Sequence, residues 1–143
     1  MEIITAAKES MAELLAVWEA SVRATHDFLS ERDIQAYRAL IGGQYLHSLN
    51  LFCIKEENSI VGFIGLQGRL IQMLFIHPHY MSRGLGKAFV KFAVDKHSAR
   101  EVDVNEQNTK ALGFYQSLGF KAFDRFEIDD AGKPYPILSL SLK

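Results

Sequence analysis

The sequence is poor in cysteine and proline, and it has almost no excess of either charge. Its 143 residues include one cysteine, Cys53, and three prolines. A single cysteine excludes an internal disulfide and a multi-cysteine zinc site, so we expect a cytoplasmic protein. Sixteen Lys and Arg residues stand against 17 Asp and Glu residues, a net charge of −1, which disfavours binding to a nucleic-acid backbone.

Long apolar runs and targeting signals are missing as well. Residues 1–8 lack the basic start and apolar stretch of a signal peptide, and no run is long enough to cross a bilayer. An apolar fraction of 48% and a charged fraction of 23% are typical of a globular protein. Without repeats or linkers, residues 1–143 are predicted to form one domain, present as a monomer or a homodimer and without a membrane partner.

Apolar periodicity predicts the helices. Side chains from Met11 to Val22 recur at helical spacing, and a second helical pattern covers residues 31–40. Gly42-Gly43 is predicted to end the second helix, because glycine tolerates the left-handed backbone of a helix C-terminus. Two further helices are expected at residues 85–97 and 111–118.

Strands are predicted between these helices. They cover residues 3–4, 51–55, 60–66, 70–76, 101–105, 120–128 and 137–142. Leu70–Ile76 is almost unbroken in its apolar character, so we place it at the centre of the sheet with both faces covered. The order βααβββαβαββ predicts an α/β (α+β) fold, in which helices pack against a mixed sheet.

The segment Met81-Ser82-Arg83-Gly84-Leu85-Gly86-Lys87-Ala88 joins the central strand to a helix. Unpaired N–H groups and the helix dipole favour an anion there, and glycine lets a pyrophosphate approach the main chain. A tight turn without a ligand is the alternative. The segment fits neither a dinucleotide-binding fingerprint, because Phe89 replaces its third glycine, nor a Walker loop, because alanine follows Lys87.

A second segment supplies a more specific pattern. Asn108, Ala111, Phe114-Tyr115 and Gly119-Phe120 reproduce N-x-x-A-x-x-F-Y-x-x-x-G-F. Together with R/Q-x-x-G-x-G/A, which Met81 to Gly86 match except at Met81, this pattern resembles the GNAT family of N-acetyltransferases. The resemblance covers most of the chain. Residues 24–29 and 130–136 look like the corresponding segments of small bacterial members of the family. It implies a mixed, mostly antiparallel central sheet with helices on both faces, and acetyl-CoA as co-substrate.

The resemblance also implies a set of cofactor-binding residues. They are the main chain of Leu74, Phe75 and Ile76, the loop Ser82, Arg83, Gly84, Leu85, Gly86, Lys87 and Ala88, and the side chains of Asn105, Asn108 and Phe114. The two asparagines fit equally well as helix N-caps, and Phe114 as a core residue. Met81 stands where the family pattern has Arg or Gln. This difference is expected to change the affinity for acetyl-CoA only modestly, because main-chain amides hold the pyrophosphate.

Tyr115 is the predicted catalytic residue, since a phenol can stabilise or protonate the thiolate that amine attack expels. A core aromatic is the alternative for this position. His26, Asp27 and Phe28, with Tyr135, are expected near the acceptor amine, although an ordinary loop with Asp27 as a cap would explain the first three. The general base stays unassigned.

Other chemistries are disfavoured. His77 and His79 lack a third ligand, so we expect no metal site, and Cys53 lies in an apolar strand that is typical of an inert thiol. The sequence therefore predicts an enzyme that moves an acetyl group from acetyl-CoA directly to a primary amine of a small molecule or peptide. A non-catalytic acyl-CoA sensor is the alternative.

Overall fold

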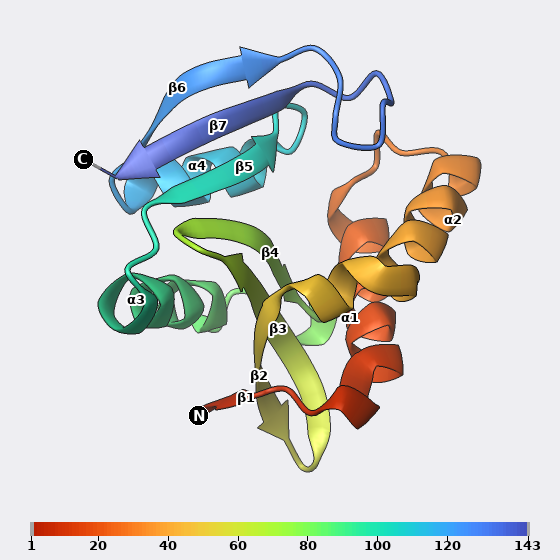
Figure 1. The fold of residues 1–143 in the computed structure, drawn as a ribbon, viewed down its shortest axis with the longest axis vertical. Helices are drawn as coiled ribbons and strands as arrows, with labels where there is room; N and C mark the ends of the chain where they lie inside the picture. Colours follow the sequence, from red (N-terminus) through yellow and green to blue (C-terminus); the bar gives the residue numbers. More distant parts are fainter. Residues whose placement is uncertain (1, 143) are drawn as a thin grey trace.

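Seven strands form one sheet in the computed structural model, which describes residues 2–142 (Figure 1). The strands are β1 (Ile3–Thr5), β2 (Asn50–Glu56), β3 (Ser59–Gln67), β4 (Leu70–Ile76), β5 (Glu101–Asn105), β6 (Phe120–Phe126) and β7 (Ile137–Leu142). The helices are α1 (Met11–Thr25), α2 (Glu31–Leu40), α3 (Leu85–His97) and α4 (Thr109–Ser117). The predicted order of strands and α-helices is confirmed. β6 ends two residues early, before a turn in which Oδ1 of Asp129 accepts from the N–H groups of Ala131 and Lys133.

The strands run in the spatial order β1-β2-β3-β4-β5-β7-β6, so the apolar strand β4 is central as predicted. All neighbours are antiparallel except β4 and β5. These two parallel strands pair only at Leu70 with Glu101 and at Ile71 with Val102, and then separate. The central sheet therefore opens between β4 and β5.

Helices cover both faces of the sheet, and each face has its own core (Figure 1). On one face, Leu14 and Trp18 of α1 pack with Phe63 of β3. On the other, Phe89 of α3 packs with Ile64 of β3, in a core that also includes α4 and β7. Because successive side chains of a strand point to opposite faces, β3 serves both cores and is buried from Ile60 to Leu66.

β4 is less covered than its apolar sequence predicts. Ile71 and Met73 are buried, whereas Leu74 and Ile76 are only half-buried because they face a cavity. Gln72 forms a β-bulge, since Gly65 pairs with Met73 but the next residue of β3 pairs with Ile71. A bulge bends a strand and redirects a side chain. The expectation of two covered faces is therefore wrong at the end of β4 that leaves β5.

The predicted bounds of α2, residues 31–40, are confirmed, but the prediction that Gly42-Gly43 ends the helical backbone is wrong. The helical backbone continues through a π-helical turn, η2 (Ile41–Tyr45), and a 3-10 turn, η3 (Leu46–Ser48), and neither glycine has a positive φ. A Cβ atom on Gly42 would lie 2.9 Å from Cδ2 of Leu15 in α1. Glycine thus permits a close approach between the π-helical turn and α1, and the helix does not need to end there.

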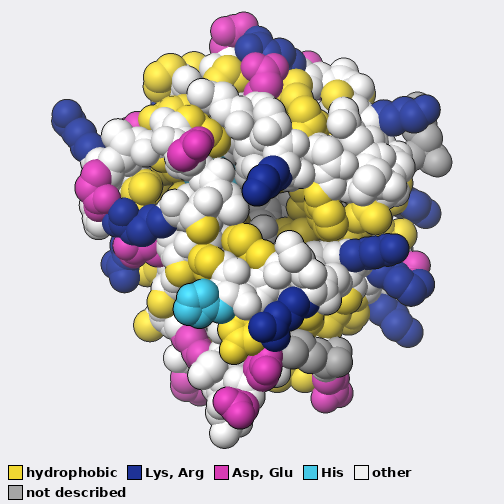
Figure 2. Space-filling model, turned by 180° about the vertical axis from the view of Figure 1, so that it is seen from behind, with side chains coloured by type: hydrophobic (Ala, Val, Ile, Leu, Met, Phe, Trp, Pro, Cys, Tyr) yellow, Lys and Arg dark blue, Asp and Glu magenta, His cyan; other side chains and the backbone are white. Residues whose placement is uncertain are grey.

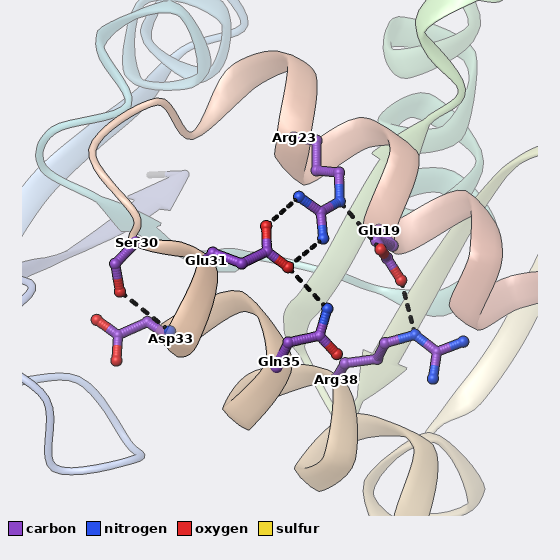
Figure 3. Close-up of polar contacts among 7 residues, drawn as sticks. All are labelled: Glu19, Arg23, Ser30, Glu31, Asp33, Gln35 and Arg38. Atoms are coloured by element: carbon purple, nitrogen blue, oxygen red, sulfur yellow. Dashed lines mark hydrogen bonds and ion pairs between the residues drawn. The ribbon is translucent and has the colours of Figure 1, made fainter.

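Polar side chains join α1 to α2 across their solvent-facing sides (Figure 3). Arg23 donates from Nη1 and Nη2 to the two carboxylate oxygens of Glu31, at 2.6 and 2.8 Å, and from Nε to Glu19 at 3.0 Å. Arg38 donates to the other oxygen of Glu19 at 2.6 Å. Hydrogen bonds from Arg23 and Gln35 lower the pKa of Glu31 to about 2. Such exposed pairs add little stability individually, but this network fixes how α2 lies on α1.

Candidate active site

A cavity of about 1020 Å³ lies where β4 and β5 separate. Residues of α1, α2, η2, β4, α3, β5, α4 and the β6–β7 loop line it. Figure 2 shows one face of the molecule, on which apolar side chains surround a central hollow and Lys and Arg side chains stand around it. We call the part of the cavity at the start of α3 its phosphate end, and the part beside α2, η2 and the β6–β7 loop its acceptor end.

The phosphate end is the start of α3. Ser82 and Gly84 have positive φ values of 65° and 81°, and Gly84 begins the helix without a side-chain cap. The first helical hydrogen bond runs from the N–H of Ala88 to the carbonyl of Gly84, at 3.1 Å. The N–H groups of residues 85–87 precede it and have no acceptor within the helix. They line the cavity at the positive end of the helix dipole, which suits an anion.

Most of the residues that the sequence assigns to the cofactor line this cavity. They are Leu74, Phe75, Ile76, Ser82, Gly84, Leu85, Gly86, Lys87, Asn105, Asn108 and Phe114. Arg83 and Ala88 do not line it. The guanidinium of Arg83 lies 4.9 Å from the ring centre of Tyr80. The N–H of Ala88 donates to the carbonyl of Gly84 within the helix.

The strand edge and the start of α4 complete the phosphate end. Among residues 2–142, the edge of β4 that faces β5 has no strand partner beyond Ile71, so its main-chain groups are open to an extended ligand. Asn108 caps α4, because its Oδ1 accepts from the N–H of Ala111 at 3.2 Å, and it also lines the cavity. Phe114 crosses to α3, where a Cβ atom on Gly86 would lie 3.3 Å from its Cζ.

Tyr115 projects from α4 into the same cavity. Its side chain is 6% exposed and packs against Phe114 and Phe120, with ring centres 5.0 and 5.6 Å apart. Within residues 2–142 its hydroxyl has no hydrogen-bond partner, so it is available to a ligand. Burial raises the pKa of Tyr115 above its ordinary value of 10, and the phenol therefore stays protonated and can donate a hydrogen bond at neutral pH.

The acceptor end contains one of the four residues predicted there. His26 lines the cavity, is 8% exposed, and has its Nδ1 2.8 Å from Oγ1 of Thr25. Burial lowers the pKa of His26 to about 4, so the imidazole is neutral near pH 7 and is a weak base. Asp27 is exposed and does not line the cavity. It is not the cap of α2 either, because Ser30 accepts from the N–H of Asp33 at 3.1 Å (Figure 3).

Phe28 and Tyr135 form a layer behind the acceptor end. Their ring centres are 5.8 Å apart, and the ring of Phe28 lies 5.3 Å from that of His26. The hydroxyl of Tyr135 donates to Asp33, and Lys133 pairs with the same carboxylate at 3.1 Å. These contacts join α2 to the β6–β7 loop. Neither aromatic residue lines the cavity itself.

Several polar residues of the acceptor end were not predicted from the sequence. They are Tyr37, Tyr45, Gln72, Asp103, Asp129 and Asp130. Tyr37 donates to Asp129 across 92 residues of sequence. Asp103 alternates with the core residues Val102 and Val104 in β5, and this alternation could have shown that its side chain faces away from that core.

The splayed sheet, the amide-lined helix start and the buried phenol meet at one cavity. The chain belongs to the GNAT acetyltransferases, because the family model described as "Acetyltransferase (GNAT) domain" matches residues 13–133. It is 42% identical to the peptidyl-lysine N-acetyltransferase YjaB of Salmonella typhimurium, over 92% of this chain and 91% of that protein. The resemblance to small bacterial members is thereby confirmed.

Solved structures agree on the fold. The solution structure of apo-form YjaB from Escherichia coli has a TM-score of 0.88 and 39% identity, and covers 98% of this chain and 95% of that one. The PaiA N-acetyltransferase of Thermoplasma acidophilum, solved in complex with coenzyme A, has a TM-score of 0.76 at 19% identity, with 98% of each chain covered. The family model and the 42% identity to YjaB show that the protein is an N-acetyltransferase, and they favour catalysis over the sensor alternative.

Two kinds of feature are absent from residues 2–142. No group of three or more His, Cys, Asp or Glu side chains there is placed to hold a metal ion. None of the helices in the same residues combines the length and the apolar character needed to cross a membrane.

Proposed function

We propose that the protein transfers the acetyl group of acetyl-CoA to the ε-amine of a lysine within a polypeptide. The name of its relative YjaB, a peptidyl-lysine N-acetyltransferase, supports this acceptor. The observation that carries the proposal is the cavity that joins an amide-lined anion site to an acidic acceptor end, with Tyr115, whose hydroxyl has no hydrogen-bond partner within residues 2–142, in the same lining. The expected location is the cytoplasm, where both substrates occur.

The phosphate end holds the coenzyme. The N–H groups at the start of α3 bind the pyrophosphate, with Ser82 of the preceding loop and Lys87 of the first helical turn beside them. The open edge of β4 at Leu74–Ile76 pairs with the amides of the pantetheine arm, while Asn105, Asn108 and Phe114 line the other side. This binding directs the thioester toward Tyr115 and the acceptor end, so two substrates react as one oriented pair.

Acetyl transfer then needs two proton movements. The neutral amine attacks the thioester carbonyl carbon, a C–N bond forms, and the C–S bond breaks to release the thiolate of coenzyme A. Tyr115 donates a hydrogen bond to that sulfur. Because its raised pKa exceeds that of a thiol, near 8.5, the phenol stabilises the thiolate and keeps its own proton.

Both protons that move come from the attacking nitrogen, one before the attack and one after it. A lysine amine has a pKa near 10.4, so most of it arrives as an ammonium ion. Asp103 and Asp130 line the acceptor end, and within residues 2–142 neither carboxylate is in an ion pair. They attract the ammonium group to the acceptor end, where it loses one proton to water and becomes the neutral nucleophile. After the C–N bond forms, the nitrogen loses its second proton to water, because His26, with a pKa of about 4, is too weak a base to hold it.

The test uses a peptide with one internal lysine and blocked ends. Incubation with acetyl-CoA is expected to add one acetyl group to that lysine, located by tandem mass spectrometry, and to release one thiol per acetyl group. A peptide with arginine in place of the lysine is the control. Transfer to small amines or to free N-termini, with none to the internal lysine, would refute the proposed acceptor.

A further inference from the structure

A second hollow, of about 510 Å³, lies beside the acceptor end of the active-site cavity. Leu138, Leu140 and Leu142 of β7 pack into the core that includes α4, so the alternate residues of β7 face the opposite way. On that opposite face, β5, β7 and β6 form the floor of the hollow. We call it the outer groove; its lining is Leu70, Glu101, Asp103, Phe123, Asp124, Phe126, Glu127, Ile128, Asp130, Ile137 and Ser139.

The outer groove is acidic. Five of its lining residues carry carboxylates, and its lining contains no Lys or Arg. Within residues 2–142, Glu127 alone among the five is in an ion pair, with Arg125 at 2.6 Å. The remaining carboxylates therefore create a negative potential that a cationic segment would relieve.

The outer groove also displays large apolar side chains. Phe123, Phe126 and Ile128 are 59%, 50% and 56% exposed. They lie on and just after β6, which is an edge strand of the sheet. An arginine guanidinium packs well on a phenylalanine ring, and the methylene stems of Lys and Arg cover apolar surface while their charged ends stay solvated. Aromatic rings among unpaired carboxylates thus suit side chains that are both long and cationic.

The outer groove is continuous with the acceptor end. Asp103, Asp130 and Ile137 line both the active-site cavity and the outer groove. A polypeptide whose lysine enters the cavity therefore passes directly over the groove on one side of that lysine.

We propose that the outer groove binds the segment of the acceptor polypeptide next to the target lysine, and that it selects segments carrying Lys or Arg. This proposal rests on the proposed function. Exposed carboxylates act mainly by attracting a cationic segment and by lowering its KM, whereas an acidic segment is repelled. A lysine flanked by Lys or Arg is then acetylated in preference to one flanked by Asp or Glu.

The test compares two blocked peptides that share one lysine and differ only in having Arg or Glu at three flanking positions. For the unmodified protein, kcat/KM is expected to favour the Arg peptide by at least about tenfold at low salt, and added salt should reduce this preference. The variant Glu101→Gln/Asp124→Asn neutralises two groove carboxylates that form no ion pair within residues 2–142. It should reduce the preference about three- to tenfold, through KM.

The matched control is Glu9→Gln/Glu57→Gln, which changes the net charge equally at two exposed positions outside the groove. The preference should be unchanged in this control. Equal kcat/KM values for the two peptides, or equal losses in both variants, would overturn the groove proposal while leaving lysine acetylation in place.

Direct binding separates the two proposals. Fluorescein-labelled versions of both peptides, with the lysine replaced by norleucine, are titrated with the protein and coenzyme A by fluorescence anisotropy. Preferential binding of the Arg peptide that the groove variant weakens would support the groove even if no lysine is acetylated. Sedimentation of the unmodified protein as a dimer and of the groove variant as a monomer would show that a second copy of the chain fills the groove, and would overturn the proposal.

Discussion

The hydroxyl of Tyr45 donates to Oε1 of Gln72 at 2.9 Å and so joins two irregular backbone segments. Tyr45 ends the π-helical turn after α2, and Gln72 is the bulged residue of β4 where β4 and β5 part. Both line the active-site cavity. π-Helical turns and β-bulges occur often at functional sites because they redirect side chains. Here the hydrogen bond joins the two irregular segments and positions them at the acceptor end of the cavity.

Removing either partner of this bond should lower stability and acceptor affinity together. Tyr45→Phe and Gln72→Leu are each expected to cost about 1 kcal/mol of unfolding free energy, because each leaves a half-buried polar group without its partner. In urea denaturation, the double variant should lose less unfolding free energy than the two single variants together, by about 0.5 kcal/mol or more. Strict additivity would show that the bond does not form in solution.

The start of α3 can be tested through coenzyme binding. For the unmodified protein, coenzyme A at a hundred times its dissociation constant should add about 2.7 kcal/mol of stability, which raises Tm by several degrees. Gly84→Leu should abolish this shift, since a side chain at φ +81° strains the loop and blocks the amides. Gly68→Leu is the control: φ is also positive there, +59°, but the residue lies in the β3–β4 turn. It should lose stability yet keep the shift.

Tyr115→Phe should lower kcat by about a hundredfold while leaving coenzyme A affinity almost unchanged. The hydroxyl has no partner within residues 2–142, so stability should change little. Because the pKa of Tyr115 is raised above 10, the kcat ratio of unmodified protein to variant should be constant between pH 7 and 9. A ratio that falls across this range would indicate that the phenol ionises during the cycle.

His26 should make stability depend on pH. Burial lowers its pKa from 6.5 in the unfolded chain to about 4 in the folded one, so the unfolded state binds the proton more tightly. This contribution to stability is complete above pH 6.5 and is lost as the pH falls toward 4, by up to about 1.4 kcal/mol per pH unit.

The measurement is urea denaturation at pH values from 7 to 4.5. Protonation of carboxylates with lowered pKa also destabilises the protein in acid. The informative quantity is therefore the difference in unfolding free energy between the unmodified protein and each variant. His26→Gln should be less stable than the unmodified protein at pH 7, and this gap should narrow as the pH falls. His47→Gln, at an exposed histidine, should show a constant gap. A constant gap for His26→Gln would contradict the buried neutral imidazole.

The contacts of Asp33 predict a stable β6–β7 loop. The carboxylate of Asp33 accepts a hydrogen bond from the hydroxyl of Tyr135 and pairs with Lys133. These contacts hold the pKa of Asp33 below its usual range. Asp33→Ala should speed amide hydrogen exchange in residues 129–135 at least tenfold at pH 7, measured by mass spectrometry. Asp27→Ala, at an exposed carboxylate on the preceding loop, is the control. Equal exchange in both variants would show that other contacts hold the loop.

Local patterns determined the framework of the protein. Leu14 and Trp18 mark the buried stripe of α1 through their spacing, and β2 and β3 lie where the predicted strands 51–55 and 60–66 are, joined by a turn in which Glu57 and Asn58 have positive φ values. The start of α3 was predictable for the same reason, because glycine positions and the order strand-loop-helix are features of neighbouring residues. The family followed from the spacing between Asn108 and Phe120.

Contacts between distant segments were decided only in three dimensions. Neither the continuation of the helix through Gly42 nor the opening of β4 away from β5 has a local signal, because the first depends on Leu15 and the second on which strands pair. The same holds for the acceptor end, where Tyr37 meets Asp129 across 92 residues. Periodicity reports which face of a helix or strand is apolar, whereas a site made of single polar residues from five or more elements exists only once those elements have packed.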